Sequence, residues 1–151
     1  MAHPPRFDEK AARRVEAVYT SPDVAGQRAL ILRALELRPG ERVLDVGVGP
    51  GFLARELAEA AGPSGALRGI DLSPAMLELA RRRLEGLPQA SLQEGDALRL
   101  PFGEGEFDAA VSIQVYEYVE DVGAALAELH RVLRPGGRAA ILDTDWGSLV
   151  W

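Results

Sequence analysis

VLDVGVGPG, residues 43–51, is the stretch that decides the fold of this chain. An apolar, β-branched run carries one acid and then breaks into three glycines at alternate positions, after which Phe52 opens a helix-like pattern. This order predicts a buried strand that turns sharply into a helix, with glycine wherever a side chain would block the turn or a ligand. The free amide donors at the start of that helix favour a nucleotide-like ligand.

The composition indicates a single globular domain. The chain has 151 residues, of which 47% are apolar and 26% charged, and this is enough for one domain with a substantial core. The net charge of −6 opposes binding to nucleic acid or to a membrane surface. No apolar run reaches the length of a membrane span and no secretory segment opens the chain, so we expect a cytoplasmic protein. With no cysteine and only two histidines, a metal centre is not expected.

Strand and helix patterns alternate along the chain. Residues 1–20 are expected to form a polar, charged N-terminal arm, and residues 21–151 a single domain without an interdomain linker. Helices are expected over about 21–38, 52–61, 73–84 and 121–133, and strands over 42–46, 67–72, 90–93, 107–115 and 138–144. This alternation predicts an α/β fold with a doubly wound, mainly parallel sheet.

Polar residues and glycines follow four of the predicted strands, at the edge where such sheets bind their ligands. They are the loop 47–51, Asp71, Asp96 and Gln114. Asp71 lies about 20 residues beyond the glycine loop, the separation expected of a carboxylate that accepts from both ribose hydroxyls. Asp96 is placed to accept from an exocyclic amine such as adenine N6. The four strand ends therefore predict an adenosine site.

The glycine spacing and one acid choose among adenosine cofactors. A dinucleotide fingerprint needs its third glycine at position 52, which is Phe52. Asp45 would repel a pyrophosphate, whereas it suits the α-ammonium or the sulfonium of S-adenosylmethionine. The chain also lacks the Gly-Lys-Ser/Thr sequence of a nucleoside triphosphate loop. A dinucleotide-dependent oxidoreductase is therefore the less favoured alternative.

Five motifs in this chain resemble those of the class I S-adenosylmethionine-dependent methyltransferases, and they occur in the same order. The closest resemblance is to the small-molecule branch, such as the ubiquinone and menaquinone biosynthesis methyltransferases. The motifs are VLDVGVGPG (43–51), GIDLSP (69–74), EGDALRLPF (94–102), FDAAVSIQVYEYVED (107–121) and RVLRPGGRAAILD (131–143). The resemblance implies a Rossmann-like methyltransferase fold. Because that family normally has seven strands, the last two strands of its sheet are expected to be lacking here.

The resemblance also implies which residues surround the methionyl end of the cofactor. Asp45 and the glycine loop would lie around it, with Ile113 or Gln114 on its other side. The loop residues concerned are Gly47, Gly49, Pro50 and Gly51, of which Pro50 is expected mainly to stiffen the turn. Tyr19 is expected to close over the cofactor from the N-terminal arm. The alternative for Asp45 is that it caps loop amides without touching a ligand.

At the adenosine end the resemblance assigns five residues. Asp71 would hold the ribose hydroxyls, Leu72 and Met76 would flank the adenosine, and Asp96 and Ala97 would meet the adenine. Three of them have a structural alternative: Asp71 as a helix cap, Met76 as a core residue and Asp96 as a turn residue.

The implied reaction is in-line methyl transfer to a small-molecule acceptor, with S-adenosylhomocysteine as the product. Such a reaction depends mainly on holding the nucleophile against the methyl carbon, and a base is needed only if the acceptor loses a proton. No catalytic residue is assigned. The candidates for a base are Tyr116, Glu117, Tyr118, Asp143 and Asp145.

Two further hypotheses concern the chain as a whole. It could bind adenosylmethionine, or act as an interaction module, without catalysing a reaction. The fifth strand is expected at an edge of the sheet, where it would be followed by an apolar tail containing Trp146, Leu149, Val150 and Trp151. Such an edge favours self-association, most simply as a twofold homodimer.

Overall fold

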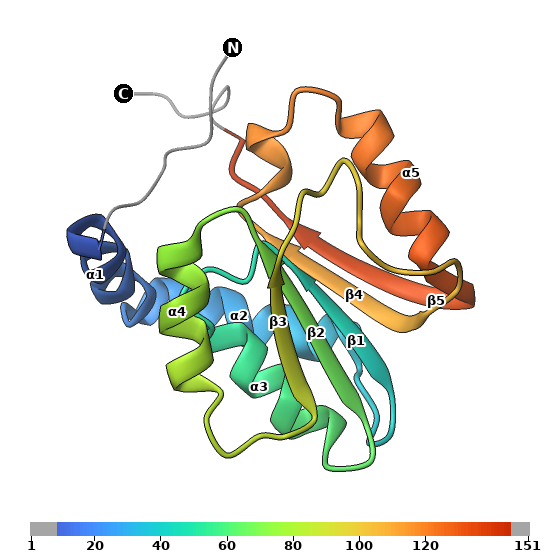
Figure 1. Cartoon of the computed structure of the whole chain (residues 1–151), viewed down its shortest axis with the longest axis horizontal. Helices are drawn as coiled ribbons and strands as arrows, with labels where there is room; N and C mark the ends of the chain where they lie inside the picture. The colour runs from blue at the N-terminus through green and yellow to red at the C-terminus, as the bar shows by residue number, and fades with distance from the viewer. Residues whose placement is uncertain (1–8, 146–151) are drawn as a thin grey trace.

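Five parallel strands form one sheet in the order β3-β2-β1-β4-β5 (Figure 1). The computed structural model describes residues 9–145. The strands are β1 (Arg42–Val46), β2 (Ala66–Asp71), β3 (Ala90–Glu94), β4 (Phe107–Ile113) and β5 (Leu133–Leu142). Because the strand order reverses between β1 and β4, the topological switch point lies at their carboxyl ends. The doubly wound α/β fold expected from the sequence is confirmed.

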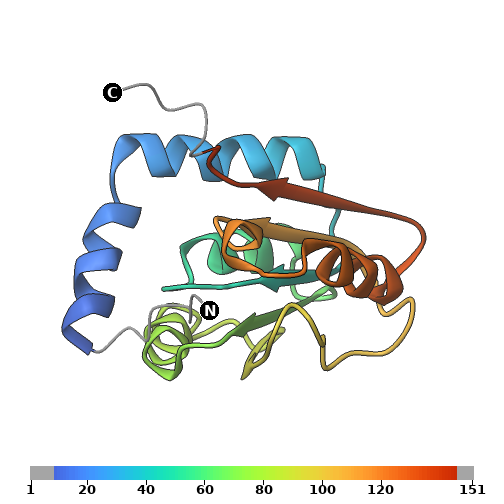
Figure 2. The same ribbon diagram turned by 90° about the horizontal axis from the view of Figure 1, so that it is seen from above.

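Helices cover both faces of this sheet. They are α1 (Glu9–Tyr19), α2 (Pro22–Leu35), α3 (Phe52–Ala61), α4 (Pro74–Arg83) and α5 (Val122–Val132), with a 3-10 turn η1 (Tyr116–Tyr118) after β4. Figure 2 shows that α1 meets the start of α2 at a sharp angle and extends from there toward α4. The stretch expected to be a polar arm thus contains a helix that packs on the domain. Residues 1–8 of the arm and the apolar tail 146–151 lie outside the described residues.

The core consists of two apolar clusters, one on each face of the sheet. The first packs α2, α3 and α4 against the sheet around Leu35, Leu57 and Leu77. The second packs α5 against the other face around Phe107, Leu129 and Val132. Strand β1 contributes Val43 to the first cluster and Leu44 to the second, because successive side chains of a strand point to opposite faces. This central strand carries the glycine loop at its end.

The helix starts expected from the sequence are present. The side chains of Ser21, Ser73 and Asp121 accept from the backbone amides of Val24, Met76 and Ala124. Each acceptor satisfies one of the unpaired amides at the start of a helix. These caps fix where α2, α4 and α5 begin.

Several boundaries differ from the prediction. Helix α2 ends at Leu35, before Pro39, because Glu36 adopts a left-handed conformation with φ 48°. Strand β4 ends at Ile113, two residues early. The expected break at 134–137 lies within β5 and forms a bulge: Phe107 pairs with Leu133, whereas Ala109 pairs with Arg138. A bulge keeps the strand in the sheet while accommodating extra residues, which a local sequence pattern cannot distinguish from a turn.

Among residues 9–145, no helix is both long and apolar enough to cross a membrane.

Candidate functional site

The glycine loop between β1 and α3 is tied to the end of β2. The amides of Gly47 and Val48 donate to the carbonyl of Ile70 at 2.9 and 2.8 Å. The amide of Gly49 donates to Oδ2 of Asp71 at 2.8 Å. The loop predicted to bind the ligand and the carboxylate predicted to bind its ribose are therefore adjacent.

Two glycines of this loop are required for different reasons. Gly49 has φ +52°, and a Cβ there would lie 3.3 Å from the hydroxyl of Tyr19. Gly51 has φ +86°, and a Cβ there would lie 2.8 Å from Cα of Ala80 in α4. Gly49 thus leaves room on the side toward the arm, whereas Gly51 permits α4 to pack against the loop.

Asp71 holds the loop and the start of α4 through its two carboxylate oxygens. Oδ1 accepts from the amide of Ser73 at 2.9 Å, while Oδ2 accepts from Gly49. Burial raises the pKa of Asp71, and the hydrogen bonds from the Ser73, Gly49 and Leu72 amides act against that rise. A carboxylate has about four acceptor positions, so these three amides leave about one position free for a ribose hydroxyl unless the Leu72 contact is given up.

Asp45 is the buried acid of the site. Asp45 is 2% exposed, and its Oδ2 has no hydrogen-bond partner. Burial, and secondarily the negative charge of Asp71, raise the pKa of Asp45 to about 7. Because Oδ2 accepts from no loop amide, nothing supports the alternative in which Asp45 caps the loop through this oxygen. An unpaired buried carboxylate oxygen is costly unless a cation or a donor meets it, so the acid fits the ammonium of an amino-acid group.

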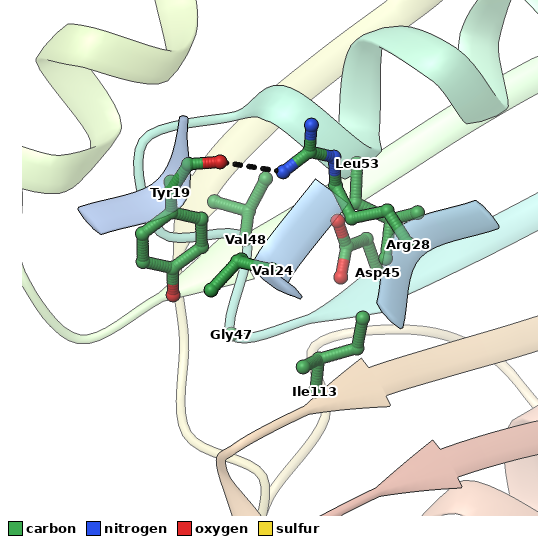
Figure 3. Close-up of a pocket in the computed structure, with 8 residues that line it drawn as sticks. All are labelled: Tyr19, Val24, Arg28, Asp45, Gly47, Val48, Leu53 and Ile113. Carbon is green, nitrogen blue, oxygen red and sulfur yellow. Dashed lines mark hydrogen bonds between the residues drawn. The ribbon is translucent and has the colours of Figure 1, made fainter. Parts of the chain in front are cut away.

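A pocket opens beside Asp45, and Figure 3 shows its lining. It brings together three of the predicted methionyl-end residues, Asp45, Gly47 and Ile113, with Tyr19 of α1. It also contains Val48 of the predicted loop and three residues that the sequence did not suggest: Val24, Arg28 and Leu53. Val24 and Arg28 come from α2, and no motif marks them because they reach the site only through packing.

Tyr19 lies over the glycine loop, as expected for a residue that closes over a ligand. Its backbone carbonyl accepts from Nη1 of Arg28 at 2.8 Å (Figure 3). Burial and the nearby Asp45 and Asp71 raise the pKa of Tyr19 to about 12. Its phenol therefore stays neutral and can donate a hydrogen bond.

The predicted adenosine-end residues are more dispersed. Leu72 is 48% exposed just after β2, whereas Met76 of α4 is 3% exposed, as expected of a core residue. Asp96 is exposed, and its Oδ1 accepts from the amide of Leu98 at 2.9 Å, the pattern of a turn residue. Ala97 is buried in the second core cluster. None of these four lines the pocket at Asp45.

The end of β4 is held by residues that follow β5. Gln114 has φ +57°, its amide donates to the carbonyl of Leu142 at 2.7 Å, and its Oε1 accepts from the hydroxyl of Thr144 at 2.8 Å. The amide of Val115 donates to Oδ1 of Asp143 at 3.0 Å. A left-handed conformation is uncommon for a residue with a side chain and marks Gln114 as constrained by its surroundings. In the glycine loop, the carbonyl of Pro50 accepts from Nη1 of Arg83 at the end of α4.

The candidate bases lie in η1 and in the segment that follows β5. Tyr116 is 3% exposed, its hydroxyl has no partner, and burial raises its pKa to about 12. Burial also raises the pKa of Tyr118, with Glu117 contributing. Glu117 is partly buried, and Asp143 and Asp145 are exposed. Within residues 9–145 there is no group of three side chains suited to hold a metal ion.

Comparisons with known proteins agree with this geometry. The family described as "Methyltransferase domain" matches residues 44–141, more than half of the chain. The 2-phytyl-1,4-naphtoquinone methyltransferase of Synechococcus elongatus is 46% identical over 109 residues, which cover 70% of this chain and 47% of that protein. The demethylmenaquinone methyltransferase of Staphylococcus aureus is 35% identical over 122 residues, covering 81% of this chain and 51% of that protein.

A third relative and a solved structure extend the comparison. An uncharacterised 37.1 kDa protein in a Streptomyces fradiae transposon is 44% identical over 136 residues, or 90% of this chain and 39% of that protein. Phosphoethanolamine N-methyltransferase 2 of Haemonchus contortus, solved with S-adenosylmethionine, matches with a TM-score of 0.81 at 27% identity, over 90% of this chain and 33% of that one. The chain spans about half or less of the length of these relatives. By its family match, its fold and its loop, the chain belongs to the methyltransferase domain family, among the class I S-adenosylmethionine-dependent methyltransferases.

Proposed function

We propose that this protein transfers a methyl group from S-adenosylmethionine to a small-molecule acceptor with a quinone-type ring, by in-line displacement. The observation that carries the cofactor half of the proposal is the unpaired, buried Oδ2 of Asp45 beside the glycine loop. The similarity to a naphthoquinone methyltransferase and a demethylmenaquinone methyltransferase supports the acceptor half.

The cofactor supplies a methyl group on a positively charged sulfur, a reactive leaving-group arrangement that the protein does not have to create. Asp45 would face the ammonium of its amino-acid end, and Gly47, Gly49 and Gly51 would surround that end, with Pro50 stiffening the turn. Ile113 or Gln114 would contact the same end from β4. These residues bind and orient, which is the main requirement of such a displacement.

At the other end, Asp71 would accept from the two ribose hydroxyls while keeping its bonds to the Gly49 and Ser73 amides. Leu72, with its exposed side chain, would cover one face of the adenosine. Asp96 and Ala97 would meet the adenine edge, with Met76 supporting the ring from the core. The exposure of Leu72 and Asp96 supports this arrangement because both side chains are accessible to a ligand.

If the acceptor loses a proton, the tyrosines of η1 are poor bases. An effective base has a pKa near the working pH, whereas burial raises the pKa of Tyr116 to about 12. Tyr116 would instead serve as a donor to the acceptor. Asp143 is the more accessible carboxylate at this edge, although its Oδ1 already accepts from Val115.

The experiment is titration calorimetry of the chain with S-adenosylmethionine, S-adenosylhomocysteine and NAD, followed by transfer of a labelled methyl group to reduced 1,4-naphthoquinone. We expect both adenosyl ligands to bind and NAD not to bind. Binding of NAD in preference to S-adenosylhomocysteine would contradict the cofactor. Binding of the adenosyl ligands without transfer would favour the second candidate, a non-catalytic adenosylmethionine-binding module.

A further inference from the structure

One arginine outside the pocket contacts three segments that surround the cofactor loop. Arg83 is the last residue of α4 and its side chain is 20% exposed. Its Nη1 donates to the carbonyl of Pro50, and its Nη2 pairs with Oε1 of Glu16 on α1. Its guanidinium carbon lies 3.5 Å from the centre of the Phe52 ring. A single planar group therefore joins the glycine loop, the first residue of α3, and α1.

Phe52 is also the contact that brings the end of α1 onto the loop. The rings of Tyr19 and Phe52 are stacked with centres 6.2 Å apart and planes 17° from parallel. The guanidinium of Arg28 lies 5.2 Å from the Phe52 ring, and the same group donates to the carbonyl of Tyr19. Tyr19 in turn lies against Gly49. The position of Tyr19 above the loop thus depends on Phe52, which Arg83 covers.

We propose that Arg83 is a positioning residue for cofactor binding, which sets the shape of the Pro50–Phe52 turn and holds α1 so that Tyr19 closes on Gly49. This inference rests on the proposed function in taking the loop to be the cofactor site. Glu16, Phe52 and Arg83 together form this α1 clasp.

The clasp requires arginine rather than a positive charge alone. A guanidinium offers donors in a planar fork and can stack on a ring while it donates along its edge. Lysine presents one compact charge and cannot satisfy a carbonyl, a carboxylate and a ring face together. The neighbouring Arg82 shows the contrast, because its side chain is 64% exposed and pairs with Glu78 on the same helix.

Through the clasp, cofactor binding and the docking of α1 each stabilise the other. Whatever fixes the Pro50 turn favours the position of the Arg83 guanidinium, and that position favours the docked α1. A ligand that binds the loop must then stabilise α1 by the same factor by which docked α1 tightens the ligand. Simple structural support of α4 would not produce this coupling.

The test measures hydrogen exchange of residues 9–19 and the affinity for S-adenosylhomocysteine in the wild type and in Arg83→Met, which keeps the apolar stem. Without ligand, we expect Arg83→Met to speed hydrogen exchange in α1. With ligand, it should abolish the extra protection that the ligand gives α1. The affinity for S-adenosylhomocysteine should fall about tenfold. Arg82→Met is the matched control and should change none of these. Glu16→Gln removes the ion pair without touching the loop; it should speed exchange in α1 and weaken the ligand less.

The outcomes are separable. If Arg83→Met keeps both the wild-type affinity and the ligand-dependent protection of α1, the clasp is wrong. If Arg83→Met fails to fold, Glu16→Gln decides: unchanged exchange in α1 overturns the clasp, and faster exchange confined to α1 supports it. If the wild type binds no S-adenosylhomocysteine while Arg83→Met still frees α1, the proposed function fails and the clasp stands as the support of α1.

Discussion

Asp45 combines complete burial, an unpaired oxygen and a neighbouring like charge in one carboxyl group. Removing such a group from water favours its protonated form, which explains why its pKa rises from 3.8 to about 7. Without a ligand, the Asp45 carboxyl of the folded chain therefore keeps its proton at pH values at which the same group of the unfolded chain is ionised. A cationic ligand would reverse this preference by pairing with the ionised form.

The first prediction concerns stability against pH. Between pH 3.8 and about 7 the folded state holds a proton on Asp45 that the unfolded state has lost, so this group's contribution falls as the pH rises. A rise of the pKa from 3.8 to about 7 corresponds to roughly 4 kcal/mol. Asp45→Asn should remove that fall and be more stable than the wild type at pH 8, relative to pH 4. Urea unfolding of both proteins at the two pH values measures it.

The comparison with a variant is needed because other acids act in the opposite sense. The hydrogen bond from Arg131 lowers the pKa of Glu128 to about 2, so its contribution is lost as the pH falls below 4.5. Glu128 is unchanged in Asp45→Asn and cancels in the difference. Parallel stability curves for the two proteins would contradict the assignment of Asp45 as the raised group.

The second prediction concerns the ribose carboxylate. Asp71→Ala should weaken S-adenosylhomocysteine by about 1.5–3 kcal/mol, the range for hydrogen bonds to a charged group. Asp71→Asn is the control for structure, because its amide oxygen can still accept from Gly49 or Ser73. Calorimetry measures both affinities. Unchanged affinity in a folded Asp71→Ala protein would rule out the ribose role and leave Asp71 as a cap of the loop and of α4.

At the scale of elements, the site depends on how closely the glycine loop lies to its neighbours. The loop receives α4 at Gly51 and the end of α1 at Gly49. Both approaches require the absence of a side chain on a backbone with positive φ, where substituted residues are strained. The loop is thus an interface between helices as well as a ligand site.

The third prediction tests this loop. Gly49→Val should abolish binding of S-adenosylhomocysteine, because its side chain would meet Tyr19 and strain the turn. Gly26→Ala is the matched control: this glycine lies inside α2, nothing lies within 4 Å of the added Cβ, and alanine favours a helix. We expect the control to bind normally and to melt slightly higher. Normal binding by a folded Gly49→Val protein would remove the reason for assigning the cofactor to this loop.

At the scale of the whole molecule, β5 is the outermost strand of the described sheet on its side. Its burial pattern shows that Ala139 and Ile141 are exposed, while Ala140 and Leu142 pack against the first cluster. On α5, Val122 and Leu126 are also exposed. An apolar edge strand of this kind is suited to pairing with another strand.

The fourth prediction is that the 151-residue chain self-associates through β5, most simply as a twofold dimer. Sedimentation over a concentration series measures the association. Ile141→Lys places a charge on the exposed side of the strand and should shift the equilibrium toward the monomer, whereas Leu30→Lys, on the exposed side of α2, should not. A wild-type chain that stays monomeric at high concentration would contradict the prediction.

The sequence alone determined the order of the elements and the edge of the sheet that carries the site. Apolar runs, glycines and capping residues are local signals, so the starts of α2, α4 and α5 and the position of the loop after β1 followed from neighbouring residues. Asp45 and Asp71 were found because each ends or interrupts a strand pattern. Local signals were weaker at 134–137, where proline and glycines indicated a break and the chain instead continues as a bulged strand.

Only the tertiary structure decided what each of these residues contacts. That Oδ2 of Asp45 is unpaired depends on how α2 and α3 pack around β1, and that Arg28 and Val24 line the pocket depends on the position of α2. The pair between Glu16 and Arg83 joins residues 67 positions apart, and nothing in either local sequence marks its partner. Such contacts arise from packing between elements that are distant in the sequence, whereas the patterns that predict strands and helices involve residues only a few positions apart.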